Sequence, residues 1–388
     1  VVNLYGCFIC VKRMDKMKDA FENGIADKHG GNIYKAEDKY GIRKEDFLDY
    51  SANVNPLGIP QELRELIISN IDLISCYPDP ECNDLRKDIS SYLDIPSDRI
   101  IIGNGAAEII FLLFDEQKPK KVLIPSPTFC EYERAAIKLG AEVVFFRIRE
   151  ERHFKLDINE LIRCMDDNDI DSLILCNPNN PTSVLTPPDE LLCLLTAANQ
   201  RGVRIIVDET FIELTIGGNI NSVKGYLSEF DNLFIIRAFT KLFAIPGLRL
   251  GYGLGSKELI TNLWERKITW SVNCFAGISG LLLKNNYGYL DRTSLWLSEE
   301  LEHFYNDLCN LERFRVFKPD TNFILLKIND IHFNSHSLRE SMAFKGVLIR
   351  DAANFRFLDD RFIRVAIKDR DSNEKFIEIL NETIKENI

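Results

Sequence analysis

The sequence predicts an α/β fold, with a large layer built on a mostly parallel sheet and a smaller α/β layer near the C-terminus. Three observations support this prediction. Short apolar runs recur along the chain, they are continuous rather than alternating, and segments of helical length separate them. Continuous runs fit strands that are buried on both faces, and strands that alternate with helices form parallel crossover units.

Five runs rich in Val, Ile, Leu and Phe are the expected strands of the large layer. Polar, Gly or Pro residues bound each run, which limits each strand to a few residues. The runs are KVLIP (121–125), EVVFFRI (142–148), SLILCN (172–177), VRIIVDE (203–209) and NLFIIRA (232–238). Segments 129–139 and 188–201, which lie between these runs, have the length expected of helices.

The remaining chain is expected to form a smaller layer and an arm. Segment 258–312 has few Gly and no Pro, which favours helices. The apolar runs 322–328, 346–351 and 362–367 follow, and a closing helix ends the chain. Segment 29–60 is rich in Gly, Asn and Pro and is expected to be an extended arm.

Composition excludes several classes of protein. The chain has 388 residues, of which 45% are apolar, so it can bury a full core and is not disordered. Its net charge of −11 and the lack of a basic block argue against a nucleic-acid partner. No apolar run approaches the roughly 18–20 residues of a membrane span. We therefore expect neither nucleic acid nor membrane as a partner.

The cysteines and the first residues bear on metal binding and location. Of ten cysteines only Cys7 and Cys10 form a CxxC pair, and a zinc site of that kind needs a second pair. We expect no metal, no disulfide and a cytoplasmic location. The chain begins with an apolar stretch whose charged residues follow it, whereas a signal peptide has its positive charges before the apolar stretch. Residues 1–28 are expected to be a poorly ordered extension, with Met14 as a candidate start.

The motif GNGAAE (103–108) is a candidate anion site. It follows the strand-like stretch RIII (99–102) and precedes an apolar helical pattern. Small residues at a strand-to-helix turn leave backbone N–H groups open to an anion. A plain tight connection explains such a turn equally well, so the motif alone is weak.

Two further motifs follow the next strand ends. In NPNNPTS (177–183) the prolines fix a sharp turn that presents Asn180, although an ordinary loop is the simpler interpretation. In DET (208–210) the carboxylate of Asp208 stands at the carboxyl end of a strand, where parallel sheets bind ligands. A buried carboxylate without a partner is unfavourable, so Asp208 is expected to face a cationic group.

Lys241 lies just after run 232–238, next to Phe239 and Leu242. Desolvation in an apolar setting would lower its pKa, as a lysine that forms a Schiff base requires. Arg249 follows between two leucines. A lysine whose amine reaches water and a structural arginine are the alternative.

The four motifs are stronger together than apart. Each stands at a predicted strand end, so all can meet at one edge of the sheet. They offer a phosphate cradle, an amide for a phenol oxygen, a carboxylate for a ring nitrogen and an amine for an aldehyde. Pyridoxal phosphate has these groups, and enzymes that use it keep its ring protonated as an electron sink. The sequence therefore predicts pyridoxal 5′-phosphate as the cofactor.

The sequence also resembles the fold-type I pyridoxal phosphate enzymes of the histidinol-phosphate aminotransferase group. Within that group it is most similar to the threonine-phosphate decarboxylase family of cobalamin biosynthesis. Besides the motifs above, the matching stretches are HGGNIY (29–34), LDYSANVNPLG (48–58), YPDP (77–80), PTFCEYERA (127–135), TKLFAIPGLRLGY (240–252), WSVN (270–273), LIRDAANF (348–355) and FIRVAI (362–367). The cofactor motifs specify only the superfamily, whereas HGGN, SANVNPLG and WSVN favour the decarboxylases.

The resemblance implies the fold and the cofactor site. The sheet would be seven-stranded and mostly parallel, within a large cofactor-binding domain at 58–275 that follows an arm at 29–57 and precedes a small C-terminal domain at 276–388. Lys241 would bind the cofactor aldehyde and Asp208 would pair with the ring nitrogen, as the catalytic residues. The other cofactor contacts would be Gly105, Ala106, Ala107, Phe129, Asn180, Thr240, Arg249 and, from the neighbouring subunit of a homodimer, Tyr77.

The resemblance also implies a small anionic phospho amino acid as the substrate. Its phosphate and carboxylate would be received by His29, Gly30, Asn53, Asn180, Arg350 and Arg364. Independently of the resemblance, two arginines at strand ends suit such a substrate, because arginine binds carboxylate and phosphate through paired hydrogen bonds. Ion pairs with nearby surface acids are the alternative, and which arginine takes which group stays open.

Two positions depart from the family pattern. Ala238 stands where the family usually has a Ser that contacts the cofactor phosphate, and Thr240 is a candidate replacement. Phe211 stands where many aminotransferases carry Tyr, a change that the decarboxylase pattern tolerates.

The sequence thus predicts a lyase that decarboxylates an O-phospho amino acid. L-Threonine O-3-phosphate would give (R)-1-aminopropan-2-ol O-phosphate, and L-serine O-phosphate would give ethanolamine phosphate, for cobalamin or cobamide biosynthesis. The first alternative is a transaminase of the histidinol-phosphate type. The second is a non-catalytic protein that binds pyridoxal phosphate.

Overall fold

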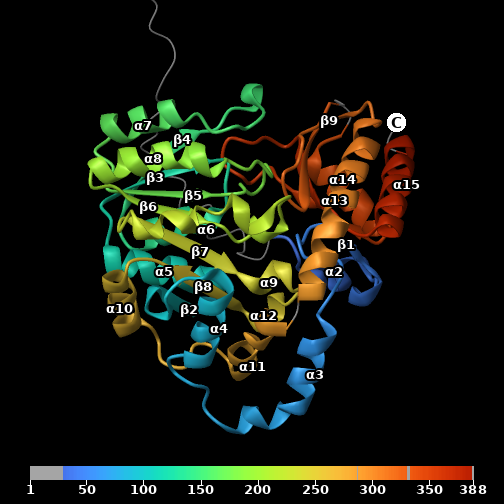
Figure 1. The fold of residues 1–388 in the computed structure, drawn as a ribbon. Coiled ribbons are helices and arrows are strands. Elements are labelled where there is room, and N and C mark those ends of the chain that lie inside the picture. The colour runs from blue at the N-terminus through green and yellow to red at the C-terminus, as the bar shows by residue number, and fades with distance from the viewer. Residues whose placement is uncertain (1–28, 286, 330–332, 387–388) are drawn as a thin grey trace, which may run out of the picture.

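The computed structural model describes residues 29–285, 287–329 and 333–386, and the expected extension at 1–28 lies outside the described residues. A large layer and a C-terminal layer stand side by side (Figure 1). No helix in these described ranges is long and apolar enough to cross a bilayer.

The large layer is built on a seven-stranded sheet, as predicted. Its strand order is β2-β8-β7-β6-β5-β3-β4, and only β8 runs antiparallel to its neighbours. The strands are β2 (Ile100–Asn104), β3 (Lys121–Ser126), β4 (Glu142–Arg147), β5 (Ser172–Cys176), β6 (Arg204–Asp208), β7 (Leu233–Ala238) and β8 (Leu250–Leu254). The five apolar runs correspond to β3, β4, β5, β6 and β7, and all but one residue of β5, β6 and β7 is buried.

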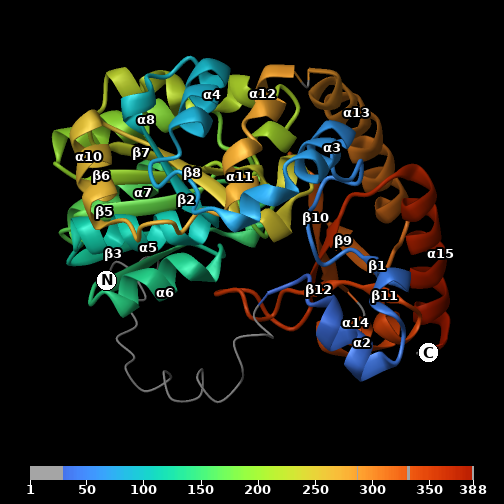
Figure 2. The same cartoon turned by 90° about the horizontal axis from the view of Figure 1, so that it is seen from below.

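Helices cover both faces of this sheet (Figure 2). One core cluster joins the sheet to α5 (Gly105–Gln117), α6 (Cys130–Lys138) and α10 (Lys257–Arg266). The other face packs against α4 (Asn83–Leu93), α7 (Ile158–Asp167) and α8 (Pro188–Gln200). Burial on both faces explains why the strand sequences are continuous apolar runs.

The C-terminal layer is a four-stranded antiparallel sheet with helices packed on it. Its order is β12-β13-β10-β9, and the predicted runs 322–328 and 362–367 supply its central strands. The elements are β9 (Phe314–Val316), β10 (Phe323–Ile328), β12 (Arg350–Asp351), β13 (Phe362–Ala366), α13 (Tyr287–Cys309), α14 (Ser335–Phe344) and α15 (Arg370–Glu386). The domain boundaries expected at residues 57 and 275 stay a prediction.

The arm differs from the extended segment that its composition predicts. Residues Ile33–Tyr40 form helix α2, which Asn32 caps by accepting a hydrogen bond from Lys35 N, and which ends at Gly41 in the left-handed conformation. After α2 the chain forms β1 (Leu48–Asp49), which pairs in parallel with β11 (Val347–Leu348). The arm therefore packs on the C-terminal layer and leads the chain to the edge of the large sheet.

Beyond the arm, helix α3 (Gln61–Ser69) and the 3-10 turn η3 (Ile71–Ser75) extend away from the large sheet (Figure 1). Near them lie the short helices α11 (Cys274–Ile278) and α12 (Leu281–Asn285). This part exposes apolar side chains, among them Ile68, Ile71 and Ile74.

Candidate active site

The candidate site lies where β5, β6 and β7 end and α5 begins. Asp208 is the last residue of β6, and the register places it between Cys176 of β5 and Ile236 of β7. Lys241 follows β7 on the short helix α9 (Phe239–Leu242), and Asn180 lies in the loop after β5. The convergence expected from the order of the motifs follows from this parallel register.

Asp208 is almost fully buried and is held by two neighbours. The backbone N–H and the hydroxyl of Thr210 donate to Oδ1 at 2.9 and 2.6 Å. The hydroxyl of Tyr132 donates to Oδ2 at 2.6 Å. Burial raises the pKa of the Asp208 carboxyl, and these hydrogen bonds oppose the rise. The carboxylate is thus oriented for a cationic partner, as a buried acid requires.

Tyr132 is a residue that the sequence reasoning missed. It occupies the first turn of α6, three residues after Phe129, and its ring is fully buried against the Phe129 ring at 5.6 Å between centroids. The signal was present in PTFCEYERA, where residues three apart on a helix share a face.

The amine of Lys241 lies among cationic groups in a largely buried setting. Burial lowers its pKa to about 8, and the charges of Arg364 and Arg249 add to the effect. An amine with this pKa is partly neutral near physiological pH, which is the state that attacks an aldehyde.

The turn into α5 has the features of an anion cradle. Asn104 gives no side-chain cap, so the first N–H groups of the helix, from Gly105, Ala106 and Ala107, have no side-chain acceptor there. Gly105 has a φ of +78°, and a Cβ on it would lie 2.5 Å from Nη2 of Arg249. The guanidinium therefore lies over the start of the helix, where a phosphate would bind.

Gly251 on β8 allows the helix to approach this closely. A Cβ at Gly251 would lie 2.4 Å from the nitrogen of Ala106. Thr240 is buried on α9. Ala238, which departs from the family pattern, brings no hydroxyl and therefore leaves one possible donor fewer. The cradle, the acid and the amine together fit a phosphorylated pyridine aldehyde.

Phe211, the second departure, is part of the packing. Its buried ring meets Phe323 of β10 edge-on, with 5.0 Å between centroids. It thus joins the large layer to the C-terminal layer without offering a hydroxyl to the site.

Arg364 connects the C-terminal layer to the loop that carries Asn180. Its Nη1 donates to Asn180 Oδ1 at 2.5 Å and its Nη2 donates to Ser51 O at 2.7 Å. Its Nε is buried without a hydrogen-bond partner, and so is Oδ1 of Asn53. Burial lowers the pKa of Arg364 to about 9, and the charge of Arg350 adds to this shift. Unsatisfied buried polar atoms of this kind are ready to bind a ligand.

Arg350 stands directly opposite Arg364 in the pairing of β12 with β13. Its Nη1 donates to Asp351 O at 2.8 Å and its Nη2 to Asn354 Oδ1 at 2.7 Å. Arg350 also lines a cavity of about 290 Å³, together with His29 and Gly30. A Cβ on Gly30 would lie 2.3 Å from Ser51 O, so the arm approaches the substrate side only with glycine there.

Tyr77 stands apart from this arrangement, whereas Phe129 borders it through Tyr132. The ring of Tyr77 is 80% exposed and stacks on Trp270 at 4.5 Å, so it is presented outward. Phe129 is half-buried at the start of α6, with its ring 5.8 Å from that of His29.

Comparisons with known proteins identify the family. The family model for aminotransferase class I and II matches residues 45–380. A candidate threonine-phosphate decarboxylase of Caldanaerobacter subterraneus is 40% identical over 93% of this chain and 95% of its own length. The threonine-phosphate decarboxylase of Salmonella typhimurium is 32% identical over 92% of this chain and 96% of its own length.

A solved structure, the histidinol-phosphate aminotransferase from Clostridium acetobutylicum, is 36% identical and has a TM-score of 0.81. The match covers 87% of this chain and 99% of that one. Enzymes of this family use pyridoxal phosphate, which the residues described above fit. The chain therefore belongs to the aminotransferase class I and II family and, within it, to the threonine-phosphate decarboxylase group.

Proposed function

We propose that this protein decarboxylates an O-phospho amino acid, with L-threonine O-3-phosphate as the first candidate and L-serine O-phosphate as the second. The observation that carries the proposal is the pair of buried arginines, Arg350 and Arg364, which stand opposite each other on β12 and β13, with Arg364 close enough to Lys241 for its charge to lower the pKa of that amine. Two buried guanidinium groups on neighbouring strands suit a substrate with two anionic groups, because arginine binds carboxylate and phosphate through paired hydrogen bonds. The curated relatives named above support the reaction.

The residues divide into those for the cofactor and those for the substrate. Pyridoxal phosphate, when bound, supplies an electron sink for the electron pair of the bond that breaks. Lys241 would hold its aldehyde, Asp208 its ring nitrogen and Asn180 its 3′-oxygen. Its phosphate would be held by Gly105, Ala106, Ala107, Thr240 and Arg249, and its ring face by Phe129.

On the substrate side, Arg350 and Arg364 would bind the carboxylate and the phosphate, with His29, Gly30, Asn53 and Asn180 around them. By fixing both ends of the substrate, these residues would determine which bond at Cα breaks. Decarboxylation requires that bond to be the one to the carboxylate. The amine of Lys241 would then return a proton to Cα.

We also propose a homodimer in which Tyr77 completes the neighbouring site. Tyr77 is exposed, and the segment that carries it also exposes Ile68, Ile71 and Ile74, beside exposed Ile268 and Trp270. Several exposed apolar side chains in one part of the molecule are typical of an interface. A second copy of the chain would bury them and would bring Tyr77 to the cofactor phosphate of its partner.

The transaminase is the second candidate function, because the solved structure that is 36% identical is a histidinol-phosphate aminotransferase. The test is incubation of the enzyme and pyridoxal phosphate with each phospho amino acid, with and without 2-oxoglutarate, and identification of products by mass. The proposal predicts aminoalcohol phosphate and carbon dioxide without any keto acid. A higher kcat/KM for amino transfer to 2-oxoglutarate would contradict it.

The arginines provide a matched control within the same assay. Arg364→Ala or Arg350→Ala should lower kcat/KM, since each removes a charged hydrogen-bond donor. The loss of transition-state stabilisation calculated from kcat/KM should be at least about 2 kcal/mol. Arg361→Ala removes an exposed arginine of the same segment, paired only with surface Asp359, and should keep kcat/KM within twofold. Unchanged kcat/KM in both Arg364→Ala and Arg350→Ala would show that the substrate binds elsewhere.

A further inference from the structure

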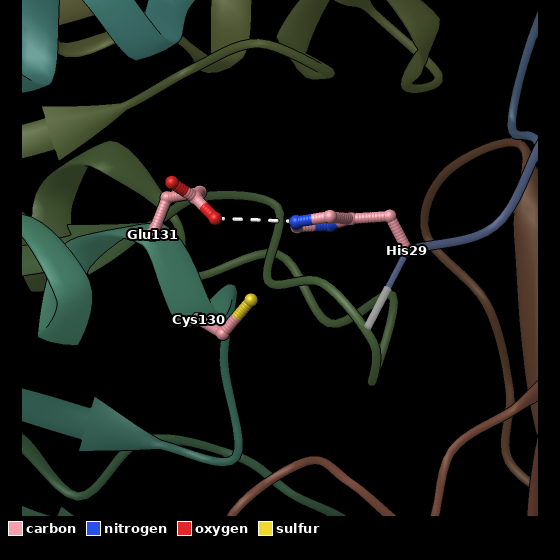
Figure 3. Close-up of side chains that lie close together, drawn as sticks. All are labelled: His29, Cys130 and Glu131. Atoms are coloured by element: carbon pink, nitrogen blue, oxygen red, sulfur yellow. Dashed lines mark hydrogen bonds and ion pairs between the residues drawn. The ribbon is translucent and has the colours of Figure 1, made fainter. Parts of the chain in front are cut away.

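Three side chains with different ligand atoms meet at the mouth of the site. They are His29 of the arm and Cys130 and Glu131 of α6, and their nitrogen, sulfur and oxygen atoms all lie within 4.8 Å of one another. Figure 3 shows the Cys130 sulfur turned toward the gap between the Glu131 carboxylate and the His29 ring. We propose that these three residues bind one divalent cation of the Zn²⁺ class.

The ligand set selects the metal. Zn²⁺ accepts thiolate, imidazole and carboxylate together, and three protein ligands leave its fourth position open. Mg²⁺ and Ca²⁺ require sets of oxygen ligands, which this cluster lacks. The prediction of no metal rested on the lack of a second CxxC pair, whereas the fold brings together ligands as far apart in the chain as residues 29 and 130.

The carboxylate of Glu131 is already prepared to coordinate. The side chain is buried, and its Oε1 lies 3.1 Å from Nε2 of His29. An ionised carboxylate is the form that binds metal, and a glutamate is ordinarily ionised at neutral pH. Nη1 of Arg134 holds Oε2 at 3.1 Å, which orients the carboxylate as an outer partner of a metal site does.

Cys130 is the first residue of α6, and it follows Phe129 directly. A thiolate at a helix N-terminus is stabilised by the partial positive charge there, and the thiolate is the form that binds metal. Backbone geometry thus fixes two ligands on one helix turn. The third ligand, Nε2 of His29, would exchange its hydrogen bond to Glu131 Oε1 for the cation, and any proton on that nitrogen would leave to solvent.

A bound cation would change what the arm does. It would hold the His29 imidazole that the proposed function assigns to the substrate, so Zn²⁺ would compete with the phospho amino acid. This consequence rests on the proposed function, whereas the metal site itself does not. The site would therefore make the enzyme sensitive to inhibition by zinc.

The test is equilibrium dialysis of the full chain, with pyridoxal phosphate, against Zn²⁺, with bound metal counted per chain. Cys7 and Cys10 are a second potential zinc ligand pair, so the reference protein carries Cys7→Ser and Cys10→Ser. This reference should bind one Zn²⁺, and adding Cys130→Ser or His29→Gln should weaken binding at least tenfold, as the loss of a ligand does. Adding Cys193→Ser, an exposed cysteine on α8, should change nothing.

Two outcomes would overturn the proposal. One is a reference protein that binds no Zn²⁺, and the other is tight binding that survives both Cys130→Ser and His29→Gln. His29 is 39% exposed, so its substitution leaves the core intact and binding can be read even if Cys130→Ser fails to fold. Zinc inhibition that competes with the phospho amino acid and weakens in Cys130→Ser tests the consequence separately. Metal binding without such competition would place the failure in the proposed function and leave the metal site standing.

Discussion

At the scale of single residues, the site depends on how burial changes the charge of Lys241. The pKa of this amine falls from its ordinary 10.5 to about 8, because a charged amine is poorly solvated there and two arginines repel it. The folded chain without cofactor therefore carries an unfavourable charge at neutral pH. A Schiff base with an aldehyde would spread or remove that charge.

This shift predicts a pH-dependent stability in the protein freed of cofactor. Between pH 8 and 10.5 the folded amine is neutral while the unfolded amine is still protonated, so stability rises with pH across this window. The Lys241→Met variant lacks the titrating amine. Its free energy of unfolding should therefore exceed that of the wild type by more at pH 7 than at pH 10, and the two differences should differ by about 2 kcal/mol. Urea unfolding at the two pH values measures these differences, and an equal difference at both would contradict the assigned environment.

Tyr132 is predicted to position Asp208. Tyr132→Phe removes the donor to Oδ2 and leaves that oxygen buried without its partner, which costs about 1–3 kcal/mol. The pKa of Asp208 should rise further and the affinity for pyridoxal phosphate should fall about tenfold. Titration of cofactor into the cofactor-free protein measures the affinity. Tyr226→Phe, on the 3-10 turn η8 (Val223–Ser228), is the control, and equal affinities in the two variants would exclude a positioning role.

At the scale of elements, the parallel strands could be predicted and the arm could not. Strands β3, β5, β6 and β7 can be predicted from the sequence, because burial on both faces requires unbroken apolar runs. Helix α2 is only eight residues long, and its packed face consists of Ile33, Ala36 and Tyr40, so its apolar stripe is too short to indicate a helix by itself. Its stability comes from packing and from its caps, which local sequence signals weakly.

In the candidate site, too, some residues could be predicted from the sequence and others could not. Residues at strand ends, such as Asp208 and Lys241, could be placed because strand order alone brings strand ends together. Tyr132, and the meeting of His29 with Glu131, depend on contacts between segments far apart in the chain. No periodicity or motif encodes a distance of that kind.

The contact of β8 with α5 gives a prediction for an element. Gly251→Ala would place a Cβ 2.4 Å from Ala106 N, so the helix start must move. The free energy of unfolding should fall by about 1–3 kcal/mol and cofactor affinity should fall with it. Gly247→Ala, in the 3-10 turn just before β8, has open space around its Cβ and is the control. Thermal unfolding with and without cofactor measures both effects, and equal behaviour of the two variants would refute the cradle.

At the scale of the whole molecule, the exposed Tyr77 argues for sites shared between two chains. The ring is 80% exposed in one chain and stands on an apolar surface. If it serves the neighbouring site, a Tyr77→Ala chain and a Lys241→Ala chain should each be impaired alone. Co-expression should restore turnover, because one site of each mixed dimer has both residues. Sedimentation measures the dimer, and activity no greater than the sum of the separate variants would contradict shared sites.

The central claim is that Lys241 carries the cofactor, and borohydride reduction tests it most directly. Reduction of the enzyme with pyridoxal phosphate, followed by digestion and mass analysis, should place a single phosphopyridoxyl group on the peptide that contains Lys241. Addition of phospho amino acid before reduction should release that label from the chain, because the substrate amine takes the place of the lysine. An unlabelled Lys241, or a label on another lysine, would contradict the account.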